Sequence, residues 1–495
     1  MAKTIVHEYR LSPPIASVAV WTTIALLVGS VLTLTGLSGV YAALALALLV
    51  VFGVAAAHYP APVMAAGIWC LGLCPFVWGL ETGVLPKLFG DESLLLLYLA
   101  VSPFLYLFTA RLPCPGFNRL YVVLALYVCT EALSFAIAPT DLVAYRNFLH
   151  TAILGAMLLV LVLNEAANSE PEKIGRAIVW VTTVIAALSI VERILQRNPI
   201  MEHGTTEFYM SAQVVQISEG VYRPYVSFFH PSEAGTFMAL GLPFALRNWV
   251  RRRSAASVMV LAVIAGGLLV NDTRGAWAGA AVAVLLSGRN VWKVLTKLVL
   301  TGAVGAGTTF FFLGNTPFMR RLTDPDNLYG RFEYWKAALR AFADHFWLGV
   351  GHMQFQQLYL SYIQDLSNTV RMDFANVYAV DNMYLTTLVE NGLLGFIAQI
   401  GLLVYIAVLL RQYRKELEIC GLSAEASFVQ CSQLALVTFA VSGFFADLEL
   451  FTKATKYFFI LVGLGLAAGA RARKLRQGGN GSDVAVSGVR MPVAG

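Results

Sequence analysis

The sequence has 495 residues, of which 58% are hydrophobic and only 13% are charged, and its formal net charge is +6 at pH 7. A soluble protein carries about 25% charged residues, so this composition excludes an ordinary soluble globular protein and indicates a polytopic membrane protein. The basic residues lie in short clusters between apolar stretches, which does not indicate a nucleic-acid partner. None of the six cysteines lies in the largest polar segment, so no disulfide framework is expected.

Long apolar stretches predict an all-α bundle of membrane-spanning helices. Such a helix needs roughly 20 apolar residues, and by this measure the chain holds about 12 to 14 of them. We expect spans at residues 15–35, 38–58, 61–80, 93–110, 119–137, 146–164, 174–194, 231–249, 254–271, 275–288, 293–314, 383–410, 426–446 and 456–470. The first span is too long for the core of a signal peptide.

The spans divide the chain into four parts. Residues 1–314 are expected to form the N-terminal transmembrane helices, 315–382 a large extracytoplasmic loop, and 383–470 the C-terminal transmembrane helices. Residues 471–495 are rich in Gly and Ser after the last basic cluster, which predicts a disordered cytoplasmic tail.

The Lys and Arg residues of the short connections predict the orientation of the bundle. They gather on alternate connections, on the side where the N-terminus and the C-terminal tail also lie. These clusters include Arg111 and Arg119; Lys173 and Arg176; Arg251, Arg252 and Arg253; Arg289 and Lys293; Arg411, Arg414 and Lys415. With this side in the cytoplasm, the segment 195–230, the turn Asn271–Gly275 and the loop 315–382 lie outside.

The large outer loop contains apolar residues at helical spacing. Arg331, Trp335, Ala338 and Phe342 recur at this spacing, so Phe332–Phe346 is expected to form an amphipathic helix at the membrane surface. Its many aromatic residues argue against disorder. Arg331 either belongs to a solvated charged face or faces an anionic substrate at the start of the helix.

The segment Asn271–Gly275 joins two apolar helices in a tight turn. Arg274 lies on the outer side, against the bias of the other basic residues. An ionisable residue near membrane depth is a functional candidate, and a guanidinium group suits a phosphate or diphosphate. The alternative is an arginine that extends to the membrane surface and pairs with Asp272.

Asp381 and Asn382 precede the helix that is expected to re-enter the membrane. Either side chain can cap that helix, which is a structural alternative to a role in catalysis. Glu390 follows about two turns later in the same apolar stretch. A carboxylate at that depth is costly and needs a partner.

The earlier outer segment contains Arg223 and His230. Pro231 suits the first position of a helix, so His230 is expected at the mouth of that helix. The histidines expected outside are scattered without metal-ligand spacing, which favours ordinary polar roles; they are His203, His230, His345 and His352. The outer loops also lack an acidic cluster, so arginines are expected to hold any phosphate group.

Four motifs in this order resemble the O-antigen ligase and polymerase family of bacterial envelope glycan enzymes. They are TRGAWAG (Thr273–Gly279), GRFEYWKAAL (Gly330–Leu339), LGVGHMQF (Leu348–Phe355) and DNMYLTTLVENGLLG (Asp381–Gly395). The segment Arg223–Gly235 looks like the one that precedes the central spans of the family.

The resemblance implies a fold and a reaction. The fold is a GT-C-like bundle of membrane helices with a large outer loop. The reaction transfers a glycan from an undecaprenyl-diphosphate carrier to a sugar hydroxyl, of lipid A-core in ligases or of another carrier-bound glycan in polymerases. It takes place at the periplasmic face of the bacterial inner membrane, with no metal or other cofactor. The implied partners are the carrier-linked glycan, a glycan or lipid acceptor, membrane lipids and other polysaccharide assembly proteins.

The resemblance also implies roles for particular residues. Arg274 and Arg331 match arginines of the family and would bind the diphosphate. Asp381 stands where the ligases usually have His before Asn382, and an ionised carboxylate can accept the proton of a hydroxyl group. This difference favours a polymerase-like role over a lipid A-core ligase.

The complete set of predicted site residues has nine members. The predicted catalytic residues are Asp381, Asn382, Arg274 and Arg331, and the predicted substrate-binding residues are Arg223, His230, Trp335, His352 and Glu390. His352 and His345 are alternative bases.

Two other functions fit parts of the sequence. A lipid-linked glycan transporter would suit the number of spans, but it needs internal repeats and a charged central cavity, whereas the charges here concentrate outside. A non-catalytic component of envelope glycan assembly would suit the departure from the family at Asp381.

Overall fold

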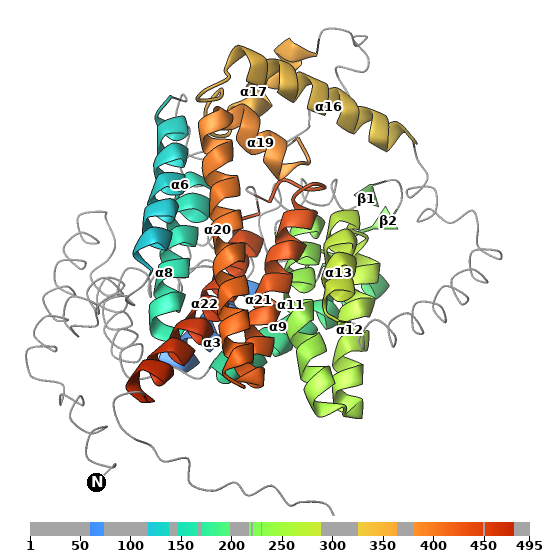
Figure 1. Cartoon of the computed structure of the whole chain (residues 1–495). Helices are drawn as coiled ribbons and strands as arrows, with labels where there is room; N and C mark the ends of the chain where they lie inside the picture. The colour runs from blue at the N-terminus through green and yellow to red at the C-terminus, as the bar shows by residue number, and fades with distance from the viewer. Residues whose placement is uncertain are drawn as a thin grey trace, which may run out of the picture.

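The computed structural model describes residues 60–73, 117–137, 147–166, 171–198, 217–218, 221–228, 230–288, 325–363, 380–448 and 451–479. These residues are almost entirely helical, which confirms the predicted all-α class (Figure 1). The exception is a short antiparallel hairpin of β1 (Ile217–Ser218) and β2 (Val221–Tyr222), in which Ile217 pairs with Tyr222.

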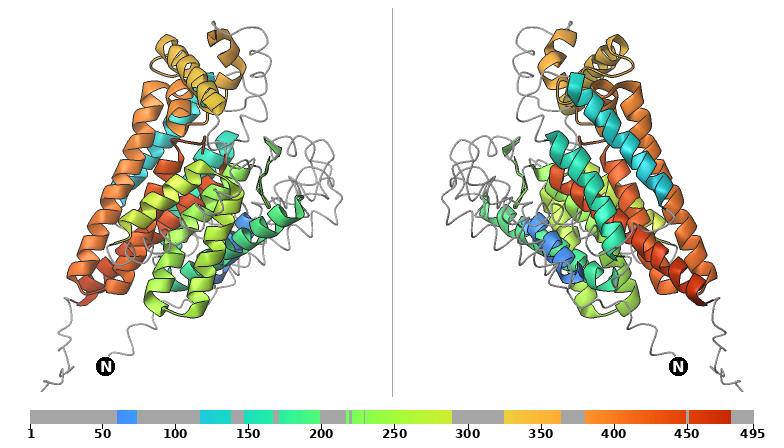
Figure 2. Two further views of the ribbon diagram at one scale, coloured as in Figure 1. Left: turned by 90° about the vertical axis from the view of Figure 1, so that its right-hand side faces the viewer. Right: turned by 90° about the vertical axis from the view of Figure 1, so that its left-hand side faces the viewer.

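The helices form a bundle and a smaller group at one end of it. The bundle contains α3 (Pro60–Leu73), α6 (Asn118–Ile137), the π-helix η2 (Leu149–Ile153), α8 (Leu154–Ala166), α9 (Pro171–Leu195), α11 (Pro231–Arg252), α12 (Ala255–Asn271), α13 (Arg274–Leu286), α20 (Gly392–Ile419), α21 (Ser423–Ser442) and α22 (Thr452–Gly479). The other group, which we call the cap, contains α16 (Pro325–Asp344), α17 (Phe355–Tyr362) and α19 (Met383–Glu390). Figures 1 and 2 show the cap at the top of the bundle.

The bundle is that of a polytopic membrane protein. Within the described residues, five helices are long and apolar enough to cross a membrane, namely α6, α9, α20, α21 and α22. The predicted spans 15–35, 38–58, 93–110 and 293–314 lie outside the described residues, so the total number of spans stays a prediction.

Burial distinguishes the centre of the bundle from its periphery. The apolar part of α22 is completely buried and packs against α8, α20 and α21. By contrast, only 28% of the residues in the apolar parts of α6 and of α20 are buried. Large side chains such as Val122 and Val404 are exposed on the surface of the bundle. In a membrane these side chains face lipid, which costs nothing because lipid tails are equally apolar.

The cap has a hydrophobic core of its own. Tyr334 and Ala338 of α16 pack with Phe355 and Tyr359 of α17 and with Val389 of α19. The prediction of a helix at Phe332–Phe346 is confirmed, although α16 begins earlier, at Pro325. Proline suits this first position because it has no N–H to leave unpaired.

The predicted span 383–410 is wrong at its start, because the chain breaks there into α19 and α20. Gly392, the first residue of α20, has a φ of +64°, and a Cβ on it would lie 2.4 Å from the carbonyl carbon of Trp347. Gly349 on the crossing segment has a φ of +73° and meets the backbone of Glu390 in the same way. Because neither glycine has a Cβ, the segment that carries Gly349 can pass directly against the start of α20. The positive φ at Gly392 also turns α19 away from the bundle.

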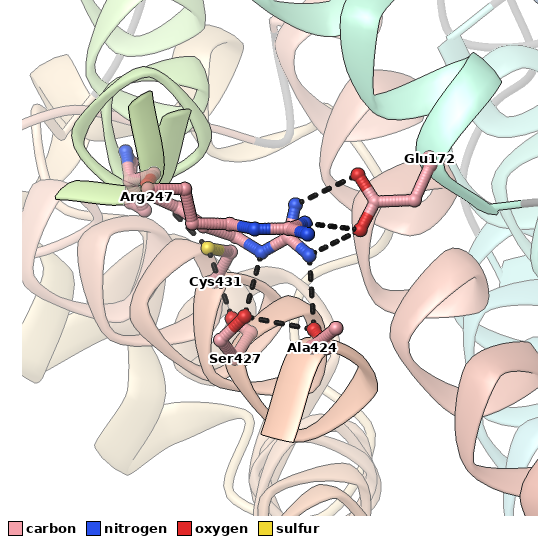
Figure 3. Close-up of polar contacts among 7 residues, drawn as sticks. Glu172, Arg247, Ala424, Ser427 and Cys431 are labelled. Atoms are coloured by element: carbon pink, nitrogen blue, oxygen red, sulfur yellow. Dashed lines mark hydrogen bonds and ion pairs between the residues drawn. The ribbon is translucent and has the colours of Figure 1, made fainter. Parts of the chain in front are cut away.

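The opposite end of the bundle is held by Arg247 of α11 (Figure 3). Its Nε donates to Oγ of Ser427 at 2.8 Å, and its Nη2 donates to the carbonyl oxygen of Ala424 at 2.9 Å. The guanidinium group also pairs with Glu172 of α9 and lies over the ring of Phe428. One side chain therefore joins α9, α11 and α21.

The prediction of a disordered tail at residues 471–495 is wrong for residues 471–479. α22 continues to Gly479, and Nε of Arg473 donates to Oε2 of Glu416 at 2.7 Å. The Arg, Ala, Lys, Leu and Gln residues after Ala470 are good helix formers, and basic side chains are favourable at a helix C-terminus. Residues 480–495 lie outside the described residues.

Candidate active site

A cavity of about 210 Å³ lies between the cap and the bundle. It is lined by Arg223, His230, Ser232, Asp272, Thr273, Arg274, Gly275, Arg331, Asp381 and Phe445. The structure therefore brings together five of the predicted site residues, from segments that are far apart in the sequence. These five are Arg223, His230, Arg274, Arg331 and Asp381.

The α12–α13 turn forms one wall of the cavity, and its predicted tight geometry is confirmed. Asp272 ends α12 in the left-handed region, with a φ of +54°, and α13 begins at Arg274. Oγ1 of Thr273 donates to Oδ1 of Asn271 at 2.6 Å, and Nδ2 of Asn271 donates to the carbonyl oxygen of Pro224 at 2.7 Å. These buried side chains fix the turn, and with it Arg274, to the segment that carries Arg223.

Arg223 is buried against this turn. Its Nη2 donates to the carbonyl oxygen of Asp272 at 3.3 Å and lies 3.2 Å from Oγ1 of Thr273. The guanidinium group of Arg223 is therefore held in a fixed direction at the edge of the cavity.

Two ionisable side chains of the bundle hold the segment that follows Arg223. Oε2 of Glu192 in α9 accepts a hydrogen bond from the N–H of Val226 at 2.7 Å. Nζ of Lys453 in α22 donates to the carbonyl oxygen of Ser227 at 2.8 Å. These two contacts were not predicted from the sequence. Glu192 offered a signal, because a carboxylate within a predicted span needs a partner.

His230 caps α11, as its place before Pro231 predicted. Its Nδ1 accepts a hydrogen bond from the N–H of Ser232 at 3.1 Å, and its ring stacks on Phe451 with centroids 5.4 Å apart. An Nδ1 that accepts carries no proton, so the ring proton of the neutral form is on Nε2.

Arg331 and Asp381 come from two different parts of the cap. Nη2 of Arg331 lies 3.3 Å from Oδ2 of Asp381. Asp381 has a φ of +54°, a conformation that costs energy for a residue other than glycine and that often marks functional sites. Desolvation raises the pKa of Asp381 above its ordinary value even though half of its side chain is exposed at the cavity, while the charges of Arg331 and Arg223 oppose this shift.

Trp335 and Asn382 support Asp381 from both sides without lining the cavity. Nε1 of Trp335 donates to the carbonyl oxygen of Val380 at 3.2 Å. Oδ1 of Asn382 accepts from the N–H groups of Tyr384 and Leu385, at 3.0 and 3.2 Å, and so caps α19. The capping alternative proposed from the sequence is thus observed for Asn382.

His352 and Glu390 do not line the cavity, so the structure does not bring them together with the five predicted site residues that do. Both are buried, together with Glu131 of α6. The reason is the break at Gly392, which turns the end of α19 toward α6 rather than toward the α12–α13 turn.

The charges of the cavity suit an anionic ligand. Three arginines and two aspartates line it, which leaves a net charge of +1 with His230 neutral. The N-termini of α11 and α13 also reach it, through Ser232 and through Arg274 and Gly275. Helix N-termini carry partial positive charge and favour phosphate groups.

No group of three or more His, Cys, Asp or Glu side chains is placed to hold a metal ion within the ranges described above. The predicted independence from metal concerns the reaction itself and stays a prediction.

Comparison with protein families matches residues 258–400 to the family described as O-antigen ligase. The match runs from α12 through the cap to the start of α20, and it contains Asp272, Arg274, Arg331 and Asp381 of the cavity. A search of the curated proteins finds no match.

Proposed function

Residues 258–400 belong to the O-antigen ligase family, and from this premise we propose that the protein transfers a glycan from an undecaprenyl-diphosphate-linked donor to a sugar hydroxyl. The observation that carries the proposal is the cavity itself. It combines three arginines, two helix N-termini and one carboxylate with a raised pKa at a single place.

The arginines act on the leaving group. When the bond between the anomeric carbon and the diphosphate oxygen breaks, its electron pair stays on that oxygen as negative charge. Arg274 and Arg331 are placed to stabilise this charge, with Arg223 as a fixed third cation. Preorganised charges of this kind make the largest single contribution to transition-state stabilisation in many enzymes.

Asp381 acts on the acceptor. The acceptor oxygen forms a new bond to the anomeric carbon as its proton passes to the carboxylate of Asp381. A raised pKa makes this carboxylate a better base than an ordinary aspartate. Trp335 and Asn382 keep its backbone in place, so both are positioning residues in this scheme.

The proposed orientation places the cavity at the periplasmic face of a bacterial inner membrane. The basic ends of α11 and α22 lie at the end of the bundle opposite the cap (Figure 1). Lys and Arg favour the cytoplasmic side, which supports a cavity that faces outward. Within this scheme the aspartate at position 381 favours a polymerase, whose acceptor is another carrier-linked glycan.

The proposal is tested with purified protein in lipid nanodiscs and an undecaprenyl-diphosphate-linked oligosaccharide. We expect release of undecaprenyl diphosphate together with a longer glycan, and about a 100-fold or greater loss of this activity in Arg274→Gln and in Asp381→Asn. Arg340→Gln is the matched control, because this exposed arginine lies on α16 and donates to the carbonyl oxygen of Tyr362 outside the cavity.

The same preparation distinguishes the rival functions. A transporter would move the labelled donor across vesicles and leave its glycan–phosphate bond intact. An assembly component without catalysis would bind no donor or leave it unchanged. Either result, or full activity in both variants, would refute the proposed reaction.

A further inference from the structure

A buried ionic cluster joins the cap to the bundle, away from the cavity. Its members are Glu131 of α6, Asn147, His352, Glu390 and Asn391, and each is less than a tenth exposed. A buried carboxylate is costly unless it is paired and hydrogen-bonded. Glu131 and Glu390 both lie near the imidazole of His352, so their burial must be offset by specific partners.

Both ring nitrogens of His352 face acceptors. Nε2 lies 3.0 Å from Oδ1 of Asn147, and Nδ1 lies 3.6 Å from Oε2 of Glu131. Oγ1 of Thr151 donates to the carbonyl oxygen of Asn147 at 2.8 Å, which fixes the backbone of this residue. Nδ1 is buried and makes no hydrogen bond to any described residue, so it meets Glu131 only as a nearby charge. This arrangement suits the protonated imidazole, whose positive charge faces the carboxylate.

The second carboxylate, Glu390, is held by the backbone. Its Oε2 accepts from the N–H of Met353 at 2.8 Å, and its carbonyl oxygen accepts from Oγ of Ser134 in α6 at 2.8 Å. Burial raises the pKa of Glu390 to about 7, against the opposing charge of His352. Below that pH Glu390 carries a proton and adds no negative charge to the cluster.

Within the part of the chain that the structure describes, three acidic groups act on His352. They are Glu131 from α6, Glu390 from α19 and Asp447 from the α21–α22 connection. Burial alone would lower the pKa of His352, but these carboxylates outweigh it and the net shift is upward.

The cluster fixes the part of the cap that leads to the cavity. His352 and Met353 follow α16, which carries Arg331, and Glu390 ends α19, which begins just after Asp381. The start of α19 is held separately by the α21–α22 connection, through the hydrogen bond from the N–H of Met383 to the carbonyl oxygen of Gly443 at 2.8 Å. The direction of α19 therefore depends on contacts at both of its ends.

We propose that Glu131, His352 and Glu390 form a positioning device that locks the cap onto α6 and thereby holds Arg331 and Asp381 at the cavity. Its effect on glycan transfer rests on the proposed function, whereas its effect on the mobility of the cap does not. Loss of the imidazolium leaves the buried carboxylates without a counter-charge, and the cap opens.

The test uses the full-length protein in nanodiscs and measures both transfer rate and hydrogen–deuterium exchange of peptides from 346–354 and 381–390. We expect His352→Gln to lower the transfer rate about tenfold and to speed exchange in both peptides. Adding Glu131→Gln to this variant removes the unpaired charge, so the double variant recovers toward the wild-type values. Glu333→Gln, which removes a carboxylate elsewhere on the cap, leaves both measurements unchanged.

A pH series provides a second test, which can be carried out even if His352→Gln does not fold. After correction for the intrinsic exchange rate, exchange of the two peptides in the wild type rises as pH increases through about 7, because Glu390 loses its proton and adds a buried negative charge to the cluster. Glu390→Gln copies the protonated carboxyl and weakens this rise.

The outcomes separate the two proposals. Equal exchange in His352→Gln and the wild type, a double variant no better than the single one, or the same pH response in Glu390→Gln would each overturn the positioning role. The expected exchange pattern in a protein that transfers no glycan would refute the proposed function alone. The expected exchange pattern with undiminished transfer would break the link between the cluster and catalysis.

Discussion

Replacing Arg331 by Gln separates an action on the substrate from a role in holding Asp381. The two side chains approach to 3.3 Å, but they are 26% and 50% exposed. An ion pair this exposed contributes at most about 1 kcal/mol to stability, so its loss lowers the Tm by no more than about 4 °C in a protein of this size. Removing a preorganised cation from a developing negative charge costs far more, about 100- to 1,000-fold in rate.

The assay measures transfer rate and thermal unfolding on the same nanodisc preparation. Arg331→Lys keeps the charge but not the two-pronged geometry of the guanidinium group, so we expect an intermediate loss of roughly tenfold. An unchanged rate in Arg331→Gln would refute the role on the substrate. A Tm decrease of about 10 °C or more would show that Arg331 acts on the fold, because it exceeds what this pair can contribute.

Three further predictions concern the fold. Gly392→Ala places a Cβ 2.4 Å from the backbone of Trp347 at a φ of +64°. It should lower the free energy of unfolding by about 3 kcal/mol. The control Gly401→Ala places its Cβ in open space and should not destabilise α20. Arg247→Met loses charged hydrogen bonds and should cost about 2 kcal/mol in denaturant unfolding, against less than about 1 kcal/mol for its half-exposed partner in Glu172→Gln. Because the pKa of Glu390 is raised from 4.5 to about 7, the folded protein binds more protons between these values, and thermal stability should be lower at pH 8 than at pH 5; equal midpoints would contradict this.

The local features of the site could be predicted from the sequence. The apolar stretches around Asn271–Gly275 and the proline after His230 indicate where helices end and begin, and these signals act over only a few residues. They correctly placed the boundary between α12 and α13 within Asn271–Gly275 and His230 at the start of α11. The helical spacing in the outer loop likewise predicted α16 and the face that carries Arg331.

The partners of Glu390 could not be found in the same way. Its carbonyl oxygen accepts from Ser134, which is 256 positions away in the sequence. The apolar pattern around Glu390 continues through Gly392, so it predicts one unbroken helix and hides the break. A carboxylate within a predicted span, such as Glu131, was the available signal, because such a residue needs a partner.

By itself the sequence determined that this is a helical membrane protein, that its large polar segment contains a helix, and that Arg274 and Arg331 are candidates for binding an anion. Only the tertiary structure decided that Arg223, Arg274, Arg331 and Asp381 meet in one cavity, while His352 and Glu390 join Glu131 elsewhere. The physical reason is range. Hydrophobic periodicity and helix capping depend on neighbours within a turn or two, whereas the meeting of distant side chains depends on how the whole bundle packs.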